Sequence, residues 1–232
     1  MTSGAEGIRE LVEVLPEPAA ARAYLGSSDM VVRAASVYLL AARWAGDAAE
    51  YRRVLQDPDH RVRIEAVRAL VCIDDAAGVV AATGDESREV RIAAAAGLAT
   101  LGGGAQGSRA VSALIADPDP LVRAAALAAL GELGCSQDGF AAVEKALRAP
   151  AWQVREGAAR ALKGAAAELA VLAISGLSEA LADAHLDVRK AAVLSLTRWA
   201  GEPAVRDALG IALKDSDADV RAYARRALER DR

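Results

Sequence analysis

A valine–arginine pair recurs along the chain at nearly regular intervals. Successive arginines of these pairs are 30, 28, 32, 32, 34 and 32 residues apart. A period of this length, kept over a whole chain, is typical of structural units that stack on one another. The pairs end at Arg33, Arg63, Arg91, Arg123, Arg155, Arg189 and Arg221.

The residues around each pair predict a helix preceded by a tight turn. In the fourth pair, Asp117-Pro118-Asp119 supplies a proline that ends one helix and an aspartate that caps the next. Val122, Ala126, Leu127 and Leu130 then fall on one face of that next helix. Apolar residues make up 53% of the chain and aromatic residues only 3%, so alanine and leucine supply the core, which favours closely packed helices over strands.

These patterns predict an all-α fold, a right-handed α-solenoid of about seven helix pairs in one domain spanning residues 1–232. Each unit has an outer helix followed by an inner helix that carries the valine–arginine pair. The predicted units are about 8–46, 47–74, 75–102, 105–134, 137–166, 167–201 and 202–232. The predicted outer helices are about 8–15 with 19–25, 47–56, 75–83, 107–116, 138–148, 167–182 and 203–214. The predicted inner helices are about 29–44, 59–73, 87–101, 119–133, 151–165, 186–200 and 218–230.

Several single residues carry further expectations about this array. We expect Gly46, Gly134 and Gly201 to form left-handed caps after inner helices. Trp44 and Trp199 occupy helix ends and are expected in the core. Arg225 stands where other units have an apolar residue, which suits a polar terminal unit.

The repeated motif D-P-D-x-x-V-R-x-x-A-x-x-A-L, nearly complete at Asp57–Leu70 and Asp117–Leu130, resembles HEAT-like repeats of the short bacterial type, also called phycobilisome-lyase-like repeats. The resemblance covers roughly Tyr24–Leu228. The third unit departs from the motif with Asp85-Glu86-Ser87 and the fifth with Ala149-Pro150-Ala151. The resemblance implies a structural role for the arginines, each reaching an aspartate in its adjoining turn. The aspartates so assigned are Asp57, Asp117, Asp183 and Asp215, with Arg63, Arg123, Arg189 and Arg221.

The sequence shows no arrangement of residues expected for catalysis, a metal or a cofactor. Gly102, Gly104 and Gly107 spell G-x-G-x-x-G, but they follow a predicted helix instead of a strand, so a turn between units is the better interpretation. His60 and His185 lie in turns of distant units, and the family's hydroxylases use His-Glu dipeptides that do not occur here. Cys72 and Cys135 form no CxxC motif, which suits a reducing compartment. We therefore expect a protein that is not an enzyme.

The solvent-facing side of the inner helices is either the binding surface or an ordinary solvated charged face. By position it carries the basic residues Arg68, Arg160, Lys163, Lys190, Arg198, Arg226 and Arg230 against Glu65, Glu132, Glu156 and Glu229. A stretch of small residues lies between these charges and could seat a partner's helix, a peptide or a second copy. Trp152 is either an exposed anchor or part of the packing. The candidate partner-binding residues are Tyr38, Glu65, Arg68, Ala96, Ala128, Trp152, Glu156, Arg160, Lys163, Lys190, Arg198 and Tyr223.

The leading functional hypothesis is a non-catalytic scaffold or adaptor that binds another protein or peptide on the concave face, as monomer or homodimer. One alternative is a nucleic-acid-binding protein similar to HEAT-like DNA glycosylases, but the net charge of −4 gives no dense basic track. A second alternative is a subunit of a chromophore lyase. We find no secretion signal in residues 1–7 and no apolar run of about 20 residues, so a cytoplasmic protein without membrane contact is expected.

Overall fold

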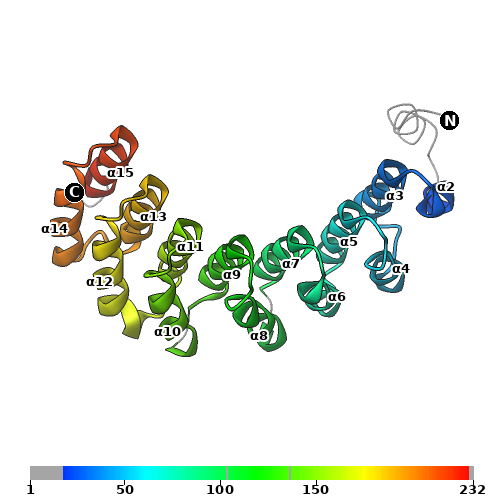
Figure 1. Ribbon diagram of the computed structural model, residues 1–232, viewed down its shortest axis with the longest axis horizontal. Helices are drawn as coiled ribbons and strands as arrows, with labels where there is room; N and C mark the ends of the chain where they lie inside the picture. The colour runs from blue at the N-terminus through cyan, green and yellow to red at the C-terminus, as the bar shows by residue number, and fades with distance from the viewer. Residues whose placement is uncertain (1–17, 103, 136, 230–232) are drawn as a thin grey trace. The chain divides into compact units, whose positions relative to one another are not determined.

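The computed structural model describes residues 18–102, 104–135 and 137–229 (Figure 1). The helix predicted at about 8–15 and the last residue of the helix predicted at 218–230 lie outside these ranges. The chain divides into two compact units, residues 1–110 and 111–232, which are described separately below. Whether they form one continuous domain stays a prediction. Helix α8, Gly104–Leu114, runs across this division.

The described residues of the first unit form a row of inner helices and a row of outer helices. The inner helices α3, α5 and α7 lie side by side, and the outer helices pack on one side of them (Figure 1). The inner helices are α3 (Met30–Ala42), α5 (His60–Cys72) and α7 (Arg88–Thr100). The outer segments are α2 (Pro18–Ala23) with the 3-10 turn Tyr24–Gly26, α4 (Ala48–Val54), and α6 (Ala76–Ala81) with the 3-10 turn Ala82–Gly84.

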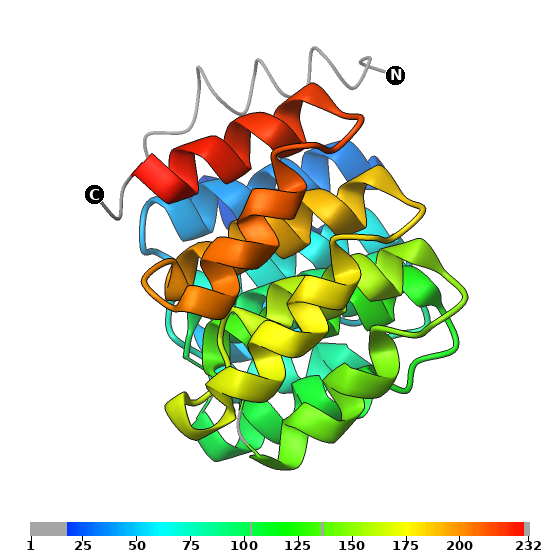
Figure 2. The same cartoon turned by 90° about the vertical axis from the view of Figure 1, so that its left-hand side faces the viewer.

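The second unit repeats this arrangement with one layer of inner and one layer of outer helices, which Figure 2 shows from the C-terminal side. Its inner helices are α9 (Pro120–Leu133), α11 (Trp152–Leu162), α13 (Leu186–Leu196) and α15 (Ala218–Glu229). Its outer helices are α10 (Gln137–Ala146), α12 (Ala170–Ala180) and α14 (Pro203–Ala212), with 3-10 turns at Ala167–Leu169 and Thr197–Trp199. The described residues form no strand beyond one isolated bridge, so the predicted all-α solenoid is confirmed.

The apolar face predicted for the inner helices is buried. In α5, Val62, Ala66, Val67 and Leu70 are all at most 1% exposed. The predicted aspartate caps also form, because the side chains of Asp29, Asp59 and Asp119 accept a hydrogen bond from the N–H two residues later. The repeated motif therefore encodes both the start of each inner helix and its packed side.

The ends of the inner helices differ from expectation. Gly134 has φ +94°, as predicted, whereas Gly46 and Gly201 are not in the left-handed region. Trp44 adopts it instead, with φ +53° at the end of α3, and its side chain is 73% exposed. The core prediction for Trp44 is therefore wrong, because the left-handed turn directs the chain away from the helix and leaves the indole in solvent. Trp199 is only partly buried.

The inner helices α9 and α11 approach each other until their backbones touch. A Cβ added to Gly157 would lie 2.7 Å from the carbonyl oxygen of Ala124, and one added to Gly164 would lie 1.9 Å from that of Gly131. Just beyond the helices, the Cys135 N–H donates to the Gly164 carbonyl at 2.9 Å, and the Ala166 N–H donates to the Cys135 carbonyl at 3.1 Å. Glycine is required here because any side chain would separate the two helices.

Candidate functional site

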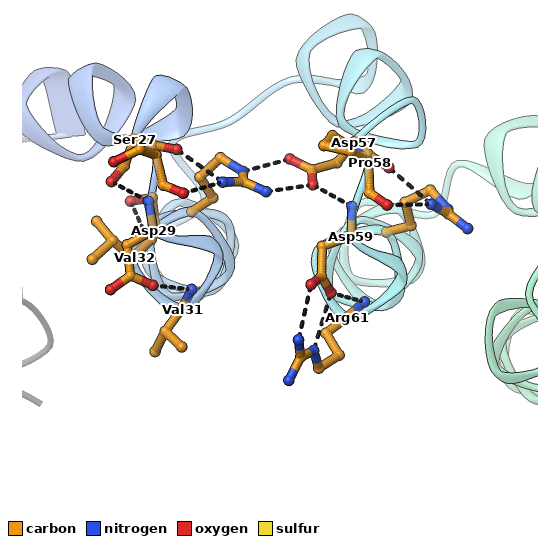
Figure 3. Close-up of polar contacts among 12 residues, drawn as sticks. Ser27, Asp29, Val31, Val32, Asp57, Pro58, Asp59 and Arg61 are labelled. Carbon is orange, nitrogen blue, oxygen red and sulfur yellow. Dashed lines mark hydrogen bonds and ion pairs between the residues drawn. The ribbon is translucent and has the colours of Figure 1, made fainter. Parts of the chain in front are cut away.

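The repeated arginines connect consecutive turns. Arg33 donates from Nη1 to the Ser27 carbonyl of its own turn at 2.8 Å. Its Nε and Nη2 donate to the two carboxylate oxygens of Asp57, in the next turn, at 2.7 and 2.8 Å. Figure 3 shows these contacts around Ser27, Asp57 and Asp59. One arginine therefore fixes its own turn through a carbonyl and the following turn through a carboxylate.

This connection corrects the pairing inferred from the sequence. Arg63 donates to the carbonyl of Asp57 in its own turn. Its Nε and Nη2, which together we call the fork of the arginine, donate to the carboxylate of Asp85, with both hydrogen bonds at 2.8 Å. In the second unit, Arg155 holds Asp183 and Arg189 holds Asp215 in the same way. Sequence reasoning missed Asp85, although it lies six residues before Arg91, as Asp57 lies six residues before Arg63.

The contact with arginine affects the titration of these carboxylates. Hydrogen bonds from Arg155 and Arg189 hold the pKa values of Asp183 and Asp215 below their usual range. Each guanidinium pKa is raised in return. The four side chains are largely shielded from solvent, which favours a structural role for the pairs over a catalytic one.

A hollow of about 590 Å³ opens on the inner helices of the second unit. We call it the inner groove. It brings together six of the predicted partner-binding residues, all in the second unit. The lining is Ala128 and Glu132 from α9, Trp152, Glu156, Arg160 and Lys163 around α11, and Asp187, Lys190, Ala191, Leu194 and Ser195 from α13.

The floor of the inner groove is small or apolar, and charges stand at its margins. Ala191 and Ser195 are at most 5% exposed, while the side chain of Leu194 is 47% exposed. An apolar residue this open, beside buried small residues, provides contact surface for a ligand. Sequence reasoning did not select Leu194, although it lies five residues after Arg189, at one of the offsets expected to leave the core.

The basic excess expected on this face is reduced by pairing within the chain. Arg160 lies 3.3 Å from the Glu156 carboxylate. Lys190 donates to Asp219 at 2.7 Å, a contact that raises the pKa of Lys190. Because these cations are already neutralised, the groove has a mixed charge and no basic track.

Trp152 and His185 form a stacked pair at the inner groove. Their ring centroids are 3.8 Å apart and their planes differ by 7°. His185 is also the N-cap of α13, because its Nδ1 accepts a hydrogen bond from the Asp187 N–H at 3.3 Å. The two interpretations left open for Trp152 are thus combined, since the indole stacks and also lines the groove. The sequence did contain a signal for the capping role of His185, because it occupies the position before its inner helix that Asp59 occupies before α5.

The remaining predicted residues lie away from the groove lining. In the first unit, Tyr38 is 62% exposed, Ala96 is exposed and Arg68 pairs with Glu65. In the second unit, Tyr223 is partly buried, and Arg198 lies 5.1 Å above the Trp199 ring and donates to the Lys163 carbonyl.

Metal and thiol chemistry find little support in the part of the chain that the structure describes. No group of three or more His, Cys, Asp or Glu side chains there is arranged to hold a metal ion. Burial raises the pKa of the Cys135 thiol to about 11, which keeps it protonated. None of the helices in the described ranges is long and apolar enough to span a bilayer.

Comparison with known proteins agrees with this architecture. Residues 76–163 and 144–229 match a sequence model of HEAT repeats. No curated protein matches the chain in sequence. Three solved structures share its fold at 17–22% identity and cover 94–97% of the chain.

The three structures differ in what they are. One is an engineered protein, with 22% identity, a TM-score of 0.62 and 70% of its own chain covered. Another is the complex of CpcE and CpcF of phycocyanin lyase from Nostoc sp. PCC7120, with 22% identity, a TM-score of 0.56 and 96% covered. The third is a designed armadillo repeat protein in complex with the peptide (KR)4, with 17% identity, a TM-score of 0.55 and 100% covered. At these identities the likeness establishes the fold alone.

Proposed function

Because this chain belongs to the HEAT-repeat family, we propose that it is a non-catalytic scaffold that binds an extended segment of another protein in the inner groove. The groove itself carries this proposal. Its floor around Ala191, Leu194 and Ser195 offers apolar and small surface, and Trp152 adds an aromatic edge. Paired charges at the margins leave polar groups for hydrogen bonds to a peptide.

The structural neighbours are consistent with this use of the fold. The designed armadillo protein holds a peptide, and CpcE and CpcF assemble with each other. The groove of the present chain differs from a receptor built for a basic peptide, because Glu156 is paired with Arg160. We therefore expect a segment of mixed charge with an apolar residue facing Leu194.

Nucleic acid is a weaker candidate for the groove. A protein that contacts 6–10 phosphates needs that many available cations. Arg160 and Lys190 instead pair with carboxylates. The chromophore-lyase alternative depends on likeness to CpcE and CpcF, and no described residue marks a tetrapyrrole site.

Selection of a random peptide library against the protein tests the proposal. Leu194→Arg places a charge on the groove floor, and Val171→Arg is the matched control because Val171 is 79% exposed on α12. We expect selected peptides to lose roughly tenfold or more affinity with Leu194→Arg and to keep it with Val171→Arg. Equal binding to both variants contradicts the proposal. Salt-dependent DNA binding or visible absorbance with a bilin, abolished by Leu194→Arg, would support one of the alternatives instead.

A further inference from the structure

The seven repeated arginines share one anchor. In each, Nη1 donates to the carbonyl oxygen six residues earlier at 2.7–3.0 Å and to the one five residues earlier. A guanidinium is planar and rigid, so fixing Nη1 at the same offset in the same helix position also fixes where its Nε and Nη2 point. The fork points to the following turn in Arg33, Arg63, Arg155 and Arg189, and the shared anchor predicts the same direction for Arg123.

The residue that meets this fork occupies a definable position. Arg33, Arg63, Arg155 and Arg189 each hold the aspartate whose own carbonyl anchors the next arginine. In the turn between α10 and α11, the carbonyl anchoring Arg155 belongs to Ala149, at 2.9 Å. At the position equivalent to the four paired aspartates, the residue that follows Arg123 in the array is therefore Ala149, which has no carboxylate.

Arg123 is correspondingly left without an acidic partner. Its hydrogen bonds within the described part of the chain go to the carbonyls of Asp117 at 2.8 Å and Pro118 at 3.0 Å, both through Nη1. Arg221 shares the anchor and lies in the last described helix, α15. We restrict the inference to Arg123.

Helices α9 and α11 pack closely although no carboxylate of the described residues pairs with Arg123. Gly131, Gly157 and Gly164 bring their backbones into contact, and the Cys135–Ala165 bridge connects the loops beyond them. Because this packing holds α9 and α11 together without an ion pair, the fork of Arg123 is free for another purpose.

We propose that the Nε–Nη2 edge of Arg123 is a carboxylate-binding site, filled by an acidic side chain or the C-terminal carboxylate of a bound protein segment. A guanidinium binds a carboxylate through two parallel hydrogen bonds, as the paired arginines of this chain do at 2.7–3.1 Å. Trp152, which lines the inner groove, begins α11 directly after the turn that contains Ala149. This site rests on the proposed function in one respect, because the bound protein segment supplies the carboxylate.

The direct test is an NMR titration that follows the Nε–H resonance of Arg123, assigned with Arg123→Lys. Sodium acetate is the probe, with sodium chloride at equal ionic strength as the reference. We expect a saturable shift for Arg123 and none for Arg155 or Arg189, whose forks are filled. In the Ala149→Asp variant the new carboxylate should occupy the fork of Arg123. The Arg123 resonance should then lie where those of the paired arginines lie, and acetate should not shift it.

Several results would overturn the proposal. The first is an Arg123 chemical shift that does not change with acetate. The second is a shift that changes equally with sulfate, and the third is a shift that still changes with acetate in Ala149→Asp. If Ala149→Asp does not fold, the contrast between Arg123 and Arg155 in the wild type decides alone.

Two further probes separate the possible sources of the carboxylate. The α-amide of N-acetyl-aspartic acid presents a side-chain carboxylate, and N-acetylglycine presents a terminal one. Saturation of the Arg123 shift at a lower concentration of one identifies the preferred source, and failure of both contradicts the site. Leu194→Arg should leave these shifts unchanged, so loss of peptide binding in that variant remains distinguishable from failure of the carboxylate site.

Discussion

Arg189 in α13 holds Asp215 in the turn before α15, with Nε 2.8 Å from Oδ2 and Nη2 3.1 Å from Oδ1. The pair spans two repeats, and both side chains are at most 14% exposed. The same carboxylate also accepts the Asp217 N–H at 2.8 Å. Asp215 thus joins one inner helix to the turn that begins the next, so a single carboxylate links these two repeats.

Removal of that carboxylate should be costly. We expect Asp215→Ala to lower the free energy of unfolding by about 1–3 kcal/mol, because the largely buried Arg189 side chain loses a charge-assisted pair. Glu156→Ala is the control, since the Arg160 side chain it pairs with is 60% exposed, and we expect a change within about 0.5 kcal/mol. Urea denaturation of both variants measures the difference, and equal values would contradict a structural role for the pair.

The same contacts predict a pH dependence. Arginine lowers the pKa of Asp183 in the folded state below the unfolded value of about 3.8, so the folded state binds the proton less well. The stabilisation is present above that unfolded value and is lost as the pH falls through the lower folded pKa. Stability should therefore decrease in acid below about 3.8, and Asp183→Asn should flatten this part of the curve. An unchanged acid slope in Asp183→Asn would show that other groups control acid unfolding.

Trp44 should limit the stability of the first unit. A non-glycine residue at φ +53° pays about 1–2 kcal/mol for the left-handed conformation. Trp44→Gly relieves this cost but increases the chain entropy of the unfolded state, so we expect a net gain of up to about 1 kcal/mol. Trp44→Ala retains the backbone cost and should show no comparable gain. Thermal unfolding of both variants provides the measurement, and a gain in Trp44→Ala equal to that in Trp44→Gly would mean that the exposed indole, not φ, is responsible.

The sequence predicted the local features of this fold well because they depend on neighbouring residues. Asp119 caps α9 and Val122 faces the core for reasons contained in one helical turn. The pairing of Arg63 with Asp85 was not predictable in that way, because a 22-residue separation between partners follows from stacking of the next repeat. The same holds for Lys190 and Asp219, whose contact removes a cation from the expected basic face.

The inner groove was predictable only in part. Sequence offsets placed Ala128 and Lys163 on the inner face, and the structure brings both into one lining. The stacking of Trp152 on His185 depends on the spacing between adjacent turns, which the sequence does not specify.

The close approach of α9 and α11 leads to a final prediction. Gly157→Ala puts a Cβ 2.7 Å from the Ala124 carbonyl oxygen, and because that atom is backbone, relief requires the helices to separate. We expect a loss of about 1–3 kcal/mol in the free energy of unfolding, typical of overpacking. Gly210→Ala in α14 is the matched control, since a Cβ there meets nothing within 4 Å. It should stabilise the protein by up to about 1 kcal/mol through helix propensity. If both substitutions stabilised the protein equally, the backbone contact between α9 and α11 would not exist in solution, and some other contact would have to join these two helices in the absence of an ion pair from Arg123.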